Sequence, residues 1–295
     1  MAVQTRSAAR LPELQAAWKR RVLAKSGAML AIYLYALRAW VNADSSDAAE
    51  VANAEAVREA QLENGSGMKL ALTALCCFLA TLTNAMEFFA FPAPHLSDKK
   101  WVVMGDGLGG HFVYLTIHIT VLQQIYWTAC FLAGAGFVEW PALTFSAYRL
   151  TPFISGIAIA LGLLFLKLNW FEPGWRKEVL EAYRGRGEWT FGPMVLFTHL
   201  NQTLTAILDV AVIKRDSLAP LAAPAASQLL KWCLAYSFIY VVFTHINYWW
   251  NGGSWPYPIL DIVFKKSSTK IAFIAAVTMF IFICASAFLF FIVTF

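Results

Sequence analysis

The chain has 295 residues, of which 59% are hydrophobic and 14% are charged, and its formal net charge is +5. A soluble domain carries about 25% charged residues, so this composition excludes a protein whose whole surface faces water. The long runs of Leu, Ile, Phe, Val and Ala have the length of helices, and lipid requires an internal partner for every backbone polar group. We therefore predict an all-α polytopic transmembrane helical bundle rather than a barrel of alternating ten-residue strands.

The first segment, residues 1–67, is predicted to be a basic interfacial and linker extension. Leu11, Leu14 and Trp18 alternate with basic residues, as in an amphipathic helix on anionic lipid, and a solvated basic tail fits the same pattern. The apolar stretch Ala28–Val41 is short and interrupted by an arginine, so we expect it to lie on the membrane surface or to pack as a short re-entrant or interfacial helix, and whether it spans stays open. The basic residues extend too far before any apolar run for a signal peptide.

Residues 68–295 contain six apolar stretches of about 20 residues, each predicted to be a transmembrane helix. These stretches are Lys69–Phe91, Phe112–Val138, Leu150–Trp170, Phe191–Ile213, Leu229–Trp249 and Ile271–Phe295. Lys and Arg nearly balance across the two sides, so the positive-inside rule gives only a lean toward a cytosolic N-terminus. We expect an integral multi-pass protein of an endomembrane such as the endoplasmic reticulum, or of the plasma membrane.

All five cysteines fall inside these apolar stretches, where Cys is usually a small packing residue. Neither a disulfide framework nor a zinc site is indicated, and we expect no metal and no organic cofactor. The motifs typical of soluble hydrolases, nucleotide-binding loops and metalloproteases are absent from the sequence. No nucleic-acid partner is implied.

Polar side chains inside the second and fourth spans are informative, because they are costly in lipid and usually face the bundle interior. They recur at helical spacing on one face of each helix: Thr116, Thr120 and Gln123 on the second span, and His199, Gln202 and Thr203 on the fourth, with Asp209 farther along. A polar seam between the two helices follows from this pattern.

In a six-span topology, the starts of the second and fourth spans and the end of the fifth lie on one side of the membrane. At 1.5 Å per residue, Thr116 lies about 6–8 Å and His199 about 12 Å inside the predicted span ends. His245 and the loop Asn251–Pro258 fall toward the same side. A threonine hydroxyl becomes a nucleophile when a neutral histidine accepts its proton, so such a site could cleave a lipid ester. The residues alone leave open a structural alternative, in which the threonine bonds to its own helix and the histidine only packs.

The run Gly109–Thr116, His199 at the head of the fourth span, and the Trp-Pro-Tyr-Pro motif Trp255–Pro258 occur here in order. Together they resemble the androgen-induced-protein family, which includes the androgen-dependent tissue-factor-pathway-inhibitor regulator. The resemblance covers about Met68 to the C-terminus. It implies a multi-pass threonine hydrolase that cuts the internal ester of fatty acid esters of hydroxy fatty acids.

On this resemblance, Thr116 is the nucleophile, His199 is the general base, and the partners are a lipid ester substrate and the bilayer. The candidate substrate-binding residues are His245, Trp255, Tyr257, Gln123 and Gln202. The oxyanion donor stays open among Asn201, Gln202, Gln123, Tyr257 and a backbone N–H. Trp255 and Tyr257 also fit a role as interfacial aromatic anchors.

Two other function classes fit parts of the pattern. A b-type haem oxidoreductase would use His118, His199 or His245 as axial ligands. A non-enzymatic transporter, channel or lipid-binding scaffold would place Asp209 and the polar stripes along a pathway. The extra stretch Asn247–Ser254, beside the presumed entrance, leaves the preferred substrate chain length open.

Overall fold

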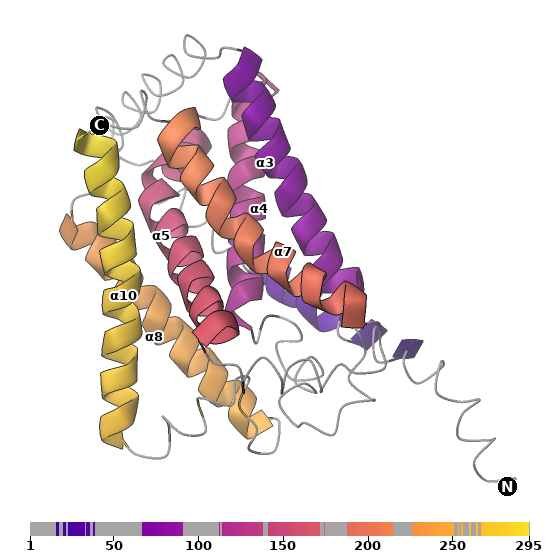
Figure 1. Ribbon diagram of the computed structural model, residues 1–295, viewed down its shortest axis with the longest axis vertical. Coiled ribbons are helices and arrows are strands. Elements are labelled where there is room, and N and C mark those ends of the chain that lie inside the picture. Colours follow the sequence, from indigo (N-terminus) through magenta and orange to yellow (C-terminus); the bar gives the residue numbers. More distant parts are fainter. Residues whose placement is uncertain are drawn as a thin grey trace, which may run out of the picture.

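The computed structural model describes residues 16–17, 20–21, 23–32, 34–35, 38, 67–90, 112, 114–137, 141–171, 174, 188–214, 226–250, 253, 255, 260, 264 and 267–294. Six of its helices are long and apolar enough to cross a membrane. They are α3 (Gly67–Ala85), α4 (Leu115–Gly134), α5 (Pro141–Phe171), α7 (Glu188–Leu208), α8 (Ala226–Trp250) and α10 (Ser267–Thr294), shown in Figure 1. The predicted all-α, six-span membrane bundle is confirmed.

Two of these helices continue directly into a short π-helical segment. α3 runs into Met86–Ala90, and α7 runs into Asp209–Ile213. Each segment has an acidic residue in its first turn, Glu87 and Asp209 respectively, and both side chains are buried. π-helical turns inside α-helices are rare and are found frequently at functional sites.

The helices run in alternating directions, and α5 lies centrally in the bundle (Figure 1). α5 packs against α4, α7, α8 and α10, and α3 packs against α4 and α7. Because directions alternate, the ends of α3, α5 and α8 lie at the same side as the starts of α4, α7 and α10. The packing of α4 against α7 brings together the two helices that carry the predicted catalytic pair.

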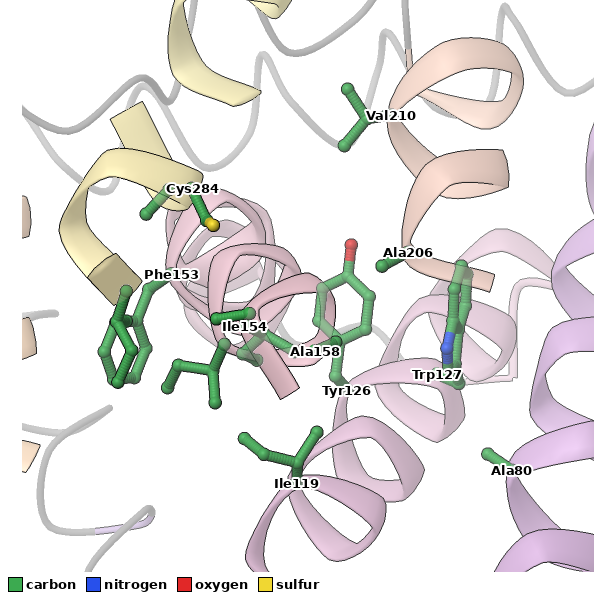
Figure 2. Close-up of a cluster of buried hydrophobic side chains, with 14 of the residues drawn as sticks. Ala80, Ile119, Tyr126, Trp127, Phe153, Ile154, Ala158, Ala206, Val210 and Cys284 are labelled. Atoms are coloured by element: carbon green, nitrogen blue, oxygen red, sulfur yellow. The ribbon is translucent and has the colours of Figure 1, made fainter. Parts of the chain in front are cut away.

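A core of buried apolar side chains joins α3, α4, α5, α7 and α10. Figure 2 shows Tyr126 and Trp127 of α4 lying between Phe153 and Ile154 of α5 on one side and Ala80 of α3 on the other. In lipid, such interfaces are held by close van der Waals packing rather than by the exclusion of water. Small residues therefore matter where two helices approach closely.

One such approach is between α5 and α10. A Cβ atom built on Gly156 of α5 would lie 2.5 Å from the Cβ of Ala285 in α10. This separation is shorter than two carbon atoms tolerate, so only glycine fits at this position.

Several predicted helix boundaries differ from the structure by a few residues or more, and two of these differences have a clear physical reason. α4 begins at Leu115 rather than at Phe112, because Tyr114 has an extended backbone (φ −90°, ψ 129°). α5 begins at Pro141 rather than at Leu150, since proline is favoured in the first turn of a helix and hydropathy detects only the apolar part, Leu150–Lys167.

The N-terminal extension contributes the short apolar helix Leu23–Ile32, whose ten residues are fewer than the roughly 20 that a span needs. Its Met29 packs against a cluster at the start of α4 formed by Phe112, Ile117 and Val121. Of the predicted interfacial stretch Ala28–Val41, residues 33, 36–37 and 39–41 lie outside the described residues. The division into residues 1–67 and 68–295 stays a prediction.

Candidate active site

Thr116 is the second residue of α4, in the first turn of the helix. The carbonyl of Tyr114 accepts hydrogen bonds from the backbone N–H groups of Ile117 (3.1 Å) and His118 (3.4 Å), which closes this turn. The N–H of Thr116 comes before both, where no earlier carbonyl of the helix can accept it. The N–H of Thr116 and the positive end of the α4 dipole therefore lie beside its hydroxyl.

His199 of α7 faces Thr116. The Nε2 atom of its ring lies 3.3 Å from the Oγ1 atom of Thr116, a contact that joins residues 83 positions apart in the chain. The other ring nitrogen, Nδ1, lies 3.3 Å from the hydroxyl oxygen of Thr198. Both nitrogens of the imidazole thus have a hydroxyl partner.

A third element fixes the plane of the imidazole. The ring of Phe165 in α5 stacks on the ring of His199, with 4.2 Å between the centroids and 21° between the planes. Phe165 is buried, whereas Thr116 and His199 are both partly exposed. Part of the surface of Thr116 and of His199 is therefore exposed, while one face of the imidazole is covered by Phe165.

The pair lies close to one membrane face. The apolar spans begin at Leu115 in α4 and at Leu196 in α7, so Thr116 is one residue and His199 three residues inside. At 1.5 Å per residue, Thr116 lies about 2 Å and His199 about 5 Å past these residues, and α7 itself begins at Glu188, eleven residues before His199.

The polar seam continues deeper between α4 and α7, but its amides are already engaged. The side-chain amide of Gln123 donates to the backbone carbonyl of Gln202 at 2.9 Å, and that of Gln202 donates to the carbonyl of Thr198 at 2.9 Å. Asn201 donates to the hydroxyl of Thr83 in α3 at 2.9 Å. The amides of Gln123 and Asn201 link two helices each and that of Gln202 bonds within α7, which leaves the backbone N–H of Thr116 as the better-placed candidate for an oxyanion donor.

The predicted substrate-binding residues on the C-terminal side form a separate aromatic cluster. The ring of His245 lies 4.9 Å from that of Trp255 and 5.0 Å from that of Phe264, measured between centroids. Its Nδ1 atom contacts the carbonyl of Val241, one turn earlier in α8, at 2.7 Å. The structure therefore brings His245 and Trp255 together with each other, whereas Thr116 and His199 form their own pair. Tyr257 lies outside the described residues.

His118 is buried on another face of α4 from Thr116. Its ring contacts Tyr236, Tyr240 and Phe243 of α8, and its Nε2 atom contacts the carbonyl of Phe112. It lies at the interface between α4 and α8 as a packing residue. Within the described parts of the chain, no group of three or more His, Cys, Asp or Glu side chains could hold a metal ion.

Three neighbours of the pair were not identified from the sequence: Glu87, Phe165 and Thr198. Glu87 is a carboxyl group inside a predicted span, and an ionisable residue at such a position is itself a signal of a functional site. Phe165 carries no such signal, since a phenylalanine in a membrane helix faces lipid as readily as another side chain. Thr198 is distinguished only by being next to His199.

Comparison with known protein families identifies the family of this chain. A family model described as "FAR-17a/AIG1-like protein" matches residues 70–290, a region that contains all six apolar spans apart from a few terminal residues. Neither a curated protein nor a solved structure matches the chain. Since the match covers most of the chain, this six-span membrane protein belongs to the FAR-17a/AIG1-like family, that is, the androgen-induced protein family.

Proposed function

We propose that the protein is an intramembrane hydrolase of lipid esters, in which Thr116 is the nucleophile and His199 is the general base. The observation that carries the proposal is the 3.3 Å contact between Thr116 Oγ1 and His199 Nε2. A positioned hydroxyl and imidazole are the minimum that acyl transfer requires. Family membership supports esters of the class implied by the resemblance, the fatty acid esters of hydroxy fatty acids.

The reaction proceeds in two steps. The proton of the Thr116 hydroxyl moves to Nε2 of His199 while the oxygen attacks the ester carbonyl, and the hydroxy fatty acid leaves with that proton. Water, activated by the same imidazole, then attacks the acyl-threonine ester and releases the fatty acid. The N–H of Thr116 and the positive end of α4 stabilise the negative charge that develops on the carbonyl oxygen.

The position of the pair supports a substrate that is half in lipid. Thr116 lies in the first turn of α4, one residue from the start of its apolar span, so the ester carbonyl can meet water there. The exposed apolar side chains of the neighbouring helices face the bilayer, including Leu163, Leu164 and Leu196. Acyl chains stay in an apolar environment beside them, where each buried methylene contributes about 0.8 kcal/mol.

The test is hydrolysis of a branched fatty acid ester of a hydroxy fatty acid by purified protein in detergent or nanodiscs. We expect Thr116→Val to abolish turnover, and His199→Ala to lower kcat by about 10²–10⁴-fold. The matched control is Thr120→Val, one turn deeper in α4, where the hydroxyl only donates to the carbonyl of Ile117 at 2.9 Å. Thr120→Val also replaces a threonine hydroxyl of α4 by a methyl group, and this variant is expected to remain active.

A second measurement identifies the intermediate. After a rapid acid quench, the peptide that contains Thr116 should carry one acyl group, and the same peptide from Thr116→Val should not. Wild-type protein that is inactive on all lipid esters, or a folded Thr116→Val variant that is as active as wild type, would rule the proposal out.

A further inference from the structure

Glu87 is a buried carboxyl group that the hydrolytic steps above do not use. It lies in the π-helical segment at the end of α3 and is 5% exposed. A carboxylate at the edge of the apolar layer is costly unless a hydrogen bond or a positive charge compensates it. The side chain of Glu87 hydrogen-bonds to that of Thr198 in α7, the helix against which α3 packs.

Thr198 links this carboxyl group to the imidazole. Its side chain is fully buried, and its hydroxyl oxygen lies 3.3 Å from Nδ1 of His199. When Nε2 accepts the proton of Thr116, the neutral ring must carry its own proton on Nδ1. That Nδ1–H can donate to the oxygen of Thr198, whose own O–H then donates to Glu87.

We propose that Glu87 and Thr198 are positioning residues for His199, acting through a chain of three hydrogen bonds that all run in one direction. Thr116 donates to Nε2, Nδ1–H donates to Thr198, and Thr198 donates to a carboxyl oxygen of Glu87. The chain selects the tautomer with a free Nε2 and stabilises the imidazolium that forms during attack. This inference rests on the proposed hydrolase function.

Only one proton moves in the chemical step. The O–H bond of Thr116 breaks as its oxygen bonds to the carbonyl carbon, and the proton goes to Nε2. The protons on Nδ1 and on Thr198 remain in place, so Glu87 neither gains nor loses a proton. An acid that orients a catalytic imidazole in this way acts on its tautomer and its charge, not as a proton acceptor.

Two other ionisable groups near this end of the bundle, among the residues that the structure describes, are turned elsewhere. His118 of α4 lies among the aromatic rings of α8, and Lys167 near the end of α5 is exposed. Glu87 is thus the acidic side chain that the structure connects to His199.

A matched control distinguishes the proposed role from a purely structural one, in which Glu87 and Thr198 only join α3 to α7. The hydroxyl of Thr83 in α3 accepts a hydrogen bond from Asn201 of α7 at 2.9 Å. Thr83→Val breaks this other α3–α7 contact and leaves the neighbours of His199 intact. Variants of the proposed chain are Glu87→Gln and Thr198→Val, and Thr198→Ser restores the hydroxyl.

The first readout is the tautomer of His199, measured by ¹⁵N NMR on histidine-labelled full-length protein in nanodiscs in alkaline buffer, with the resonance assigned by a His199→Gln variant. Wild type, Thr198→Ser and Thr83→Val are expected to show Nδ1–H. Glu87→Gln and Thr198→Val should lose this preference and show a mixture or Nε2–H.

The second readout is ester hydrolysis. We expect Glu87→Gln and Thr198→Val to lower kcat by about 10–100-fold with little change in KM, and Thr198→Ser to recover most of the loss. Unchanged tautomer and kcat in both variants would overturn the inference, as would an equal effect of Thr83→Val. A wild type that hydrolyses no lipid ester, but whose tautomer responds to both variants, would support the hydrogen-bond chain and refute the hydrolase.

Discussion

Lys214 and Asp209, at the two ends of the π-helical segment that follows α7, form an ion pair in which Nζ lies 3.0 Å from each carboxylate oxygen. The two side chains are 1% and 0% exposed. The hydroxyl of Tyr126 also donates to the carboxylate, and Nζ lies 3.9 Å above the ring of the same tyrosine. A fully enclosed and compensated pair is a link between α4 and α7 rather than the lining of an aqueous pathway.

We predict that Asp209→Asn destabilises the protein strongly, because it leaves the ammonium group of Lys214 buried without its counter-charge. Breaking a buried pair by removing one partner costs about 3–5 kcal/mol. Unfolding of the variant by SDS in mixed micelles should show a fall in the free energy of unfolding of this size. Hydrolytic activity per folded molecule should change little.

The control for this prediction is the double variant Asp209→Asn with Lys214→Met, which removes both charges. Replacing an entire buried pair by uncharged groups is often close to neutral, so most of the lost stability should return. If Asp209→Asn is as stable as wild type, the charges are not held as the structure has them.

A second prediction concerns the ring that stacks on His199. Phe165→Leu keeps an apolar side chain of similar bulk but removes the flat surface against the imidazole. Aromatic stacking contributes about 0.5–1.5 kcal/mol, so kcat should fall between about twofold and tenfold with a smaller effect on KM. Phe153→Leu, three helical turns earlier in α5 and in contact with Trp232 and Tyr236 instead, is the matched control. An equal loss of kcat in both variants would show that the effect is general loosening of α5.

Hydropathy was sufficient to predict the six spans, because lipid imposes a length and a composition on every crossing helix. The polar stripes of α4 and α7 could also be predicted. Thr116 and Gln123 on α4, and His199 and Gln202 on α7, are spaced so that each pair lies on one face of an otherwise apolar helix. Their pairing depended on topology, because alternating directions place the starts of α4 and α7 on the same side of the bundle. The roles of these residues in catalysis stay predictions.

The rest of the site could not be read from spacing. Glu87 lies where α3 changes to a π-helix, and a change of helical type rotates the following side chains in a way that a period of 3.6 residues does not anticipate. Phe165 reaches His199 from a helix with no polar stripe of its own. Topology placed His245 on the same side of the bundle as Thr116. Its ring partners, Trp255 and Phe264, could not be predicted, because both follow the end of α8 and lie outside its helical spacing.

A third prediction separates the two histidines. We expect His199→Leu to remove activity and His245→Leu to retain kcat within about threefold, because the described contacts of His245 are with Val241, Trp255 and Phe264 rather than with Thr116. If the aromatic cluster lines the site of the acyl chain, His245→Leu should raise KM. The loss of the ring contacts of His245 should also lower the thermal stability of this variant. The measurement is the full dependence of rate on substrate concentration for both variants. A fall in kcat for His245→Leu as large as that for His199→Leu would assign His245 to the chemistry.

A fourth prediction tests the close approach of α5 and α10. Gly156→Ala introduces a Cβ atom 2.5 Å from that of Ala285, and both lie on helix backbones that cannot move independently. Overpacking of this kind costs about 1–3 kcal/mol, so the variant should unfold at lower SDS concentration or lower temperature than wild type. Gly134→Ala in α4 is the matched control, because its Cβ would meet the flexible side chain of Leu70 at 3.5 Å, an ordinary contact.

Since α5 also carries Phe165, Gly156→Ala should reduce activity through the position of that ring, whereas Gly134→Ala should not. Equal stability of the two variants would mean that α5 and α10 are farther apart than the structure places them.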